Sequence, residues 1–115
     1  MQRDMALIRE ILLDLRDHNE FDLRGFYARI RGEKWVIDEH IKLLIEAGYI
    51  QTDQSYFNPD IDVRITWSGH EFIDPLSSPT VWEMVQQKQE EFGVEFSAEI
   101  VSALAGTTIR ELLEM

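Results

Sequence analysis

The chain has 115 residues, the length of one ordinary domain, and its 44% hydrophobic residues can supply a buried core. The absence of cysteine excludes disulfides, thiolate metal sites and cysteine nucleophiles, and the short apolar runs exclude a membrane span. Twenty-two acidic residues against eleven basic ones give a net charge of -11, which opposes broad affinity for nucleic acid. Charged residues are spaced through the N-terminus, so we expect no signal peptide, and the lack of cysteine suits a cytoplasmic protein.

The first eighteen residues have the pattern of an amphipathic helix. Apolar side chains repeat there at helical spacing, at Met5, Leu7, Ile8, Ile11, Leu12 and Leu15. Asp4 lies near the start of the helix and Arg16 near its end, as the helix dipole favours. We therefore expect a first helix over residues 1–18.

A helix, a break and a second helix follow. Asp22 is placed to cap a short helix over 23–30, which Gly32 ends. The next helix is expected over 35–47, and Gly48 supplies the left-handed residue that ends many helices. Its buried face is formed by Ile37, Ile41, Leu44 and Ile45. This order is the outline of a helix-turn-helix.

Two short strands are expected after the third helix. Residues 49–52 are rich in β-formers, and residues 61–66 alternate apolar with polar side chains. Between them, residues 53–60 contain Asn-Pro and two aspartates, which are typical of a turn. Three helices followed by a hairpin predict a winged helix-turn-helix domain, mainly α with a small β-wing, over residues 1–76.

The remaining chain is expected to be helical. Thr66 caps a helix over 67–73 that Pro75 closes, and Ser78 with Pro79 opens another that ends at Gly93. The packed sides of the last two helices are predicted to hold Trp82, Val85, Phe92, Ile100, Val101 and Leu104.

The final helix begins after Ser97 and has a weak point at Gly106. Burial is the ordinary explanation for Trp67 and Trp82. We expect residues 77–115 to form a C-terminal helical extension of two helices.

Four segments resemble a family of small uncharacterised bacterial and prophage proteins. They are RDMALIREILLDL at 3–15, HIKLLIEAGYI at 40–50, ITWSGHEFID at 65–74 and VWEMV at 81–85, and the similarity covers about the whole chain. Ile65-Thr66-Trp67-Ser68-Gly69 is also similar to the Leu-Thr-x-x-Gly element of winged-helix regulators. The resemblance implies a winged helix with an appended helical part, often in phage or prophage contexts, and supplies no catalytic residues.

The leading functional hypothesis is a small DNA-binding transcriptional regulator of phage or prophage type. In a helix-turn-helix, the third helix enters the major groove while the second helix and the turn meet phosphates. The candidate contacts, here called the basic set, are Arg24, Arg29, Arg31, Lys34, Lys42 and Arg64. Asp38 and Glu39 oppose this hypothesis, because they make the start of the third helix more acidic than is usual in the family. The bland alternative is that the basic set consists of solvated side chains paired with nearby carboxylates.

The second hypothesis is an acidic inhibitor or adaptor that binds a basic host protein, with carboxylates that mimic phosphates, and does not bind DNA. Its candidate residues, here called the glutamate set, are Glu83, Glu90, Glu91, Glu95 and Glu99. The C-terminal helices are also the predicted contact of a homodimer, anchored by Trp82, Phe92 and Phe96, although core packing is the more frequent fate of such residues.

Catalysis is not expected. The three histidines, at positions 18, 40 and 70, are isolated and lack metal-ligand spacing. Ser68, His70 and Asp74 lie on one short helix, whereas the members of a catalytic triad converge from separate elements. We expect no enzyme, no cofactor and no metal.

Overall fold

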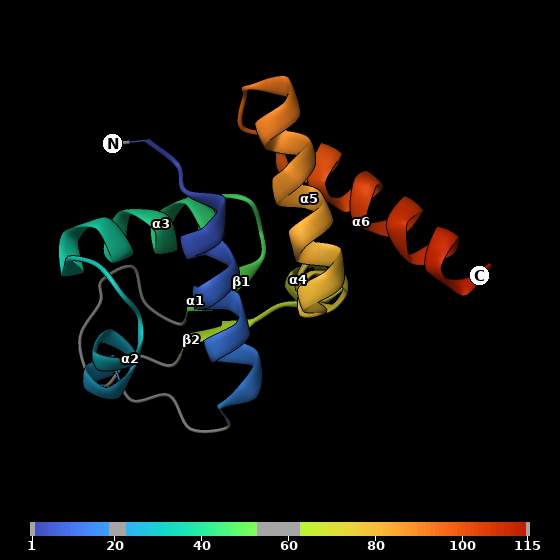
Figure 1. Ribbon diagram of the computed structural model, residues 1–115. Helices are drawn as coiled ribbons and strands as arrows, with labels where there is room; N and C mark the ends of the chain where they lie inside the picture. The colour runs from blue at the N-terminus through green and yellow to red at the C-terminus, as the bar shows by residue number, and fades with distance from the viewer. Residues whose placement is uncertain (1, 19–22, 53–62, 115) are drawn as a thin grey trace. The chain divides into compact units, whose positions relative to one another are not determined.

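The computed structural model describes residues 2–18, 23–52 and 63–114. These residues form six helices and one two-stranded antiparallel hairpin (Figure 1). The elements are α1 (Met5–Asp17), α2 (Leu23–Arg29), α3 (Lys34–Glu46), β1 (Ile50–Thr52), β2 (Val63–Ile65), α4 (Trp67–Leu76), α5 (Pro79–Phe92) and α6 (Ala98–Leu113). The chain divides into two compact units, Met1–His70 and Glu71–Met115. The predicted cap Asp22 and the predicted turn at 53–60 lie outside the described residues.

In the first unit, α1 begins later than predicted because Asp4 caps it. Its Oδ1 accepts hydrogen bonds from the backbone N–H groups of Ala6 at 3.0 Å and Leu7 at 3.3 Å. Such caps satisfy donors that have no partner within the helix. The predicted apolar stripe of α1 is largely confirmed, since Met5, Leu7, Ile8, Ile11 and Leu12 are buried.

A buried histidine joins α1 to α3. The backbone N–H of Asp4 donates to His40 Nε2 at 2.9 Å, and His40 Nδ1 lies 2.8 Å from the carbonyl oxygen of Val36. Because a backbone N–H can only donate, Nε2 must accept, so the neutral ring carries its proton on Nδ1 and donates it to Val36. His40 is fully buried and therefore belongs to the core beside Ile37, Ile41 and Leu44.

The hairpin is tied to the end of α3 and the start of α4. Gly48, at φ +81°, turns the chain after α3, as predicted. The carbonyl of Tyr49 accepts from the N–H of Thr66 at 2.9 Å, one step beyond the Ile50–Ile65 pair of the hairpin. The Thr66 hydroxyl donates to the Gly48 carbonyl at 2.6 Å and accepts from the N–H of Gly69 at 3.1 Å. The predicted role of Thr66 as a cap is thus confirmed.

Two expectations about α4 are wrong. The helix does not stop at Ile73 but continues through Pro75 to Leu76. Proline is tolerated there because it removes one hydrogen bond in the final turn of a helix that is already ending. Trp67 is not buried: it is the first residue of α4 and is 80% exposed.

In the second unit, α5 and α6 pack against each other, and their predicted ends are confirmed. The Ser78 hydroxyl accepts from the N–H of Val81 at 3.3 Å, and Pro79 occupies the first turn of α5. Gly93 ends the helix in the left-handed conformation at φ +70°. Ser97 caps α6, which is one helix through Gly106.

The predicted packed faces of these helices need correction. Val85 and Val101 are buried as predicted, and Val81, Phe96, Ala105 and Thr108 are buried with them. Trp82 and Leu104 are only partly buried. Phe92 is instead 69% exposed and Ile100 is 51% exposed. The chain turns at Gly93, so the ring of Phe96 reaches the interior while Phe92, the last residue of α5, remains outside. None of the described helices is long and apolar enough to cross a bilayer.

Candidate functional site

The described members of the basic set lie on α2, the segment after it, α3 and β2. Arg24 lies on α2, but its side chain is outside the described part of the chain. The remaining five are Arg29, Arg31, Lys34, Lys42 and Arg64. Four of these five have a carboxylate within ion-pair distance.

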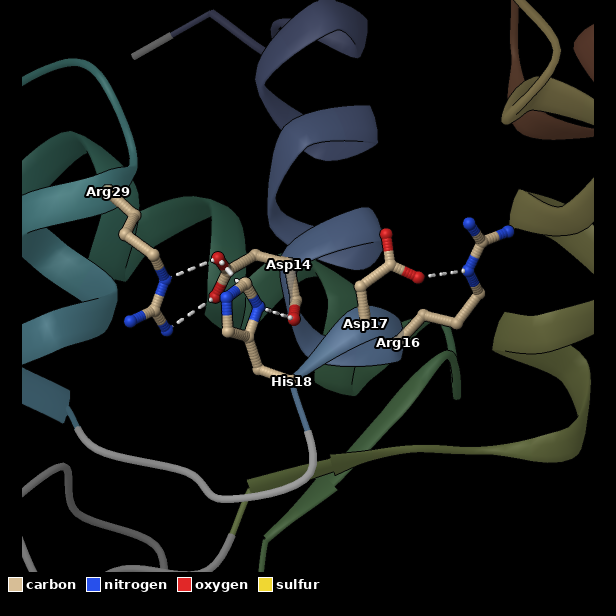
Figure 2. Close-up of polar contacts among 5 residues, drawn as sticks. All are labelled: Asp14, Arg16, Asp17, His18 and Arg29. Atoms are coloured by element: carbon tan, nitrogen blue, oxygen red, sulfur yellow. Dashed lines mark hydrogen bonds and ion pairs between the residues drawn. The ribbon is translucent and has the colours of Figure 1, made fainter.

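Arg29 is held by α1. Its Nε lies 2.7 Å from Asp14 Oδ1 and its Nη2 lies 3.0 Å from Asp14 Oδ2, a two-pronged ion pair that Figure 2 shows. The Asp14 side chain is only 8% exposed, and the ring of His18 lies against the same carboxylate, with Nδ1 3.3 Å from Oδ1. Bidentate arginine–carboxylate pairs are strong and directional, so the Arg29 guanidinium is fixed against its own unit.

Arg31 pairs with α1 one turn earlier. Its Nε donates to Glu10 Oε2 at 2.9 Å. This hydrogen bond, together with the charge of Glu10, raises the pKa of the Arg31 guanidinium. Both side chains are exposed, so this ion pair adds little to stability. The Glu10 carboxylate nevertheless offsets the positive charge of Arg31 at the surface.

The two lysines of α3 are neutralised within their own helix. Lys34 Nζ lies 2.9 Å from Asp38 Oδ2 and 5.0 Å from the centre of the Tyr27 ring, and the Tyr27 hydroxyl also donates to Asp38. Burial, followed by the hydrogen bond to Asp38 and its charge, raises the pKa of the Tyr27 phenol. Lys42 Nζ lies 3.1 Å from Glu39 Oε1. The positive and negative charges of α3, the helix predicted to enter the major groove, therefore nearly balance.

Arg64 differs from the other four. It stands opposite Gln51 in the hairpin, and its Nη2 donates to the neutral amide oxygen of that residue at 2.8 Å. A shallow cleft of 230 Å³ lies beside the Arg29–Asp14 pair, with Glu10, Asp17 and His18 among its lining residues. Each of its three carboxylates is already in an ion pair, Asp17 with Arg16 at 2.9 Å. Within the described residues, no three histidine or acidic side chains are arranged to hold a metal ion.

The glutamate set lies in the more acidic unit. Residues 71–115 contain nine acidic and two basic residues, a net charge of -7, whereas residues 1–70 contain thirteen and nine, a net charge of -4. The structure gathers four of the set around the turn between α5 and α6: Glu90, Glu91, Glu95 and Glu99. Glu83 lies apart, near the start of α5. All five side chains are exposed.

Comparison with known proteins assigns the family. The model of the family described as "Hypothetical protein (DUF2513)" matches residues 2–95. The chain belongs to this family. A Haemophilus influenzae protein named "Uncharacterized protein" is 31% identical over 98% of the chain and 99% of its own length. No solved structure matches the chain. The match to the DUF2513 family spans α1 to α5 and ends before α6.

The residues that sequence reasoning missed in this DUF2513 member are exposed apolar ones. Trp35 is exposed in the first turn of α3. The turn between α5 and α6 is flanked by three more exposed apolar residues, Phe92, Val94 and Ile100. Helical spacing predicts Phe92 and Ile100 to face inward, and it has no signal for Val94, which lies in the turn. The one available signal was the alternation of these residues with Glu90, Glu91, Glu95 and Glu99, which a buried segment would not carry.

Proposed function

We propose that this chain is a non-enzymatic, phage- or prophage-type protein whose first unit is a winged helix-turn-helix domain, and that it binds a positively charged protein partner rather than DNA. The carrying observation is the pairing of Arg29, Arg31, Lys34 and Lys42 with carboxylates of the same unit. The order of three helices followed by a hairpin supports the winged-helix assignment. A fold of this kind does not fix its own target.

The pairing weighs against DNA for an electrostatic reason. Affinity for duplex DNA comes largely from lysine and arginine replacing counterions on phosphates. Here each cation must first leave its carboxylate, and the carboxylate then remains beside the phosphate backbone. Asp14 is the clearest case, because it is nearly buried and holds Arg29 at two points.

A protein target is supported by the charge of the second unit. Its net charge of -7 over 45 residues attracts a basic surface and speeds encounter with it. The exposed members of the glutamate set present carboxylates as a nucleic acid presents phosphates, so a host nucleic-acid-binding protein fits this chemistry.

DNA binding by the first unit is the second candidate function. It is favoured by Arg64, whose partner Gln51 is neutral and whose strand belongs to the proposed wing. In that case Arg24, Arg29 and Arg31 would meet phosphates together with Lys34, and Lys42 would lie at the groove. A homodimer through the C-terminal helices would then place two such units on paired half-sites.

A fluorescence-anisotropy titration against duplex DNA separates the two functions. We expect the wild-type chain to show no binding at about 50 mM salt, where phosphate contacts are strongest. The variant Glu10→Gln plus Asp14→Asn removes the carboxylates from Arg31 and Arg29, and we expect it to gain salt-sensitive binding. Wild-type binding that weakens steeply at about 200 mM salt, and is lost on Arg29→Glu plus Arg31→Glu, would replace this proposal with the DNA function.

A further inference from the structure

The turn between α5 and α6 leaves three apolar side chains in solvent. Phe92 ends α5, Val94 lies in the turn and is 61% exposed, and Ile100 lies in the first turn of α6. Together these three residues are called the apolar corner; Figure 1 shows the turn that carries it. The centre of the Phe92 ring lies 5.9 Å from that of Phe96, which is buried. Phe92 therefore contacts the core of its unit although most of its own ring is exposed. Three large apolar side chains exposed within residues 92–100 make this turn a candidate binding surface.

The backbone that carries the apolar corner is held in place. Gly93 adopts φ +70°, and the N–H of Phe96 donates to Gln89 Oε1 at 3.1 Å. The Ser97 hydroxyl then accepts from the N–H of Ile100 at 3.2 Å. A surface that is already ordered loses little entropy when a partner docks.

The charges around the apolar corner indicate what covers it. Glu90 and Glu91 precede Phe92 in the chain, and Glu95 and Glu99 lie between Val94 and Ile100. All four glutamate side chains are exposed. The one cation between residues 88 and 100 is Lys88, which pairs with Glu91 at 3.2 Å. A second copy of the chain would bring two sets of glutamates together, whereas a cationic segment would find opposite charge on both sides of an apolar contact.

We propose that the apolar corner docks a positively charged amphipathic helix of a partner protein. An apolar side chain of that helix packs against Phe92 and Val94, and its lysines and arginines lie against the glutamates. This inference rests on the proposed function and names the surface and the partner chemistry. Helices of this kind dock with an apolar face in contact and charges at the rim.

The test is a titration of the full-length, isotope-labelled chain, followed by two-dimensional amide NMR spectra. The probe is a synthetic helical peptide with leucine on one face and lysine on the other. A second peptide with the same lysines, and serine in place of leucine, measures charge attraction alone. We expect the leucine peptide to bind at least about tenfold more tightly and to shift amide signals of residues 88–100.

Matched variants show whether the apolar corner carries this affinity. Phe92→Ser plus Val94→Ser alters exposed residues, so the fold should persist, and the NMR spectrum verifies it. We expect this variant to bind the leucine peptide at least about tenfold more weakly. Leu113→Ser, at an exposed leucine at the end of α6, should bind as the wild type does.

Several outcomes would overturn the inference. They are equal affinity for the two peptides, equal loss in the two variants, or shifts confined to residues outside 88–100. A dimer in sedimentation velocity that Phe92→Ser abolishes would also overturn it, because the corner would then contact a second copy. All of these leave the proposed function standing, whereas salt-sensitive DNA binding by the wild type removes the proposed function itself.

Discussion

Replacing Gly69 with alanine should destabilise the first unit although both residues are compatible with a helix. An ideal Cβ at position 69 would lie 2.6 Å from Ile65 Cγ1 and closer still to the carbonyl oxygen of Tyr49. Carbon atoms in contact normally stand about 3.5–4.0 Å apart, so α4 must move about 1 Å away from Ile65, at the end of β2, and from Tyr49, which precedes β1. That carbonyl accepts the hydrogen bond from Thr66, which the separation would stretch.

The expected cost follows from these distances. Overpacking of this kind costs about 1–3 kcal/mol, and a weakened backbone hydrogen bond adds about 1 kcal/mol. The higher helix propensity of alanine returns about 1 kcal/mol. We therefore expect Gly69→Ala to lower the free energy of unfolding by about 1–3 kcal/mol, measured by urea denaturation followed by circular dichroism.

Gly106 provides the matched control. It is also helical, and a Cβ there would meet nothing nearer than Arg110 Nη2 at 3.8 Å. Gly106→Ala should therefore stabilise the chain by about 0.5–1 kcal/mol through helix propensity. A gain of stability in both the Gly69 and Gly106 variants would show that no steric clash opposes a side chain at position 69.

Three further predictions concern the interior and the ion pairs. His40→Phe removes the acceptor of the Asp4 N–H and should cost about 1–3 kcal/mol in urea denaturation; an unchanged midpoint would contradict the bridge between α1 and α3. Burial raises the pKa of the Tyr27 phenol, so the folded chain keeps the phenol proton at a pH near 10, where the unfolded chain loses it. The free energy of unfolding should therefore fall as pH rises above about 10, and it should fall less steeply in Tyr27→Phe. Asp14→Ala removes the two-pronged ion pair with Arg29 and should cost about 1–2 kcal/mol, since the arginine is partly exposed; wild-type stability would show that the pair contributes nothing.

The ends of α5 and the start of α6 could be predicted from sequence because they depend on local chemistry, whereas the start of α1 and the end of α4 could not. Ser78 with Pro79, Gly93 and Ser97 each act on neighbouring backbone groups, and all of them function as predicted. Asp4 was placed correctly near the start of α1 as an acidic residue, but its role as the cap needed the structure.

The side chains that matter for binding could not be predicted in the same way. Helical spacing places Phe92 on the face of Val85, yet the turn at Gly93 decides that Phe96 is the buried ring. The pairing of Arg29 with Asp14 joins residues 15 positions apart on different helices, so it depends on how α1 and α2 pack. Sequence could raise the possibility of carboxylate pairing but could not choose the partners.

In-cell photo-crosslinking tests the central claim, binding to a protein rather than DNA, most directly. A photoreactive amino acid replaces Trp35 at the exposed start of α3 in one variant and Glu83 on α5 in another. After irradiation and denaturing purification, the adducts are treated separately with nuclease and protease. We expect protein adducts that resist nuclease, attached at position 83 to peptides rich in lysine and arginine. Nuclease-sensitive adducts at position 35 would contradict this expectation and establish the first unit as a DNA-binding domain.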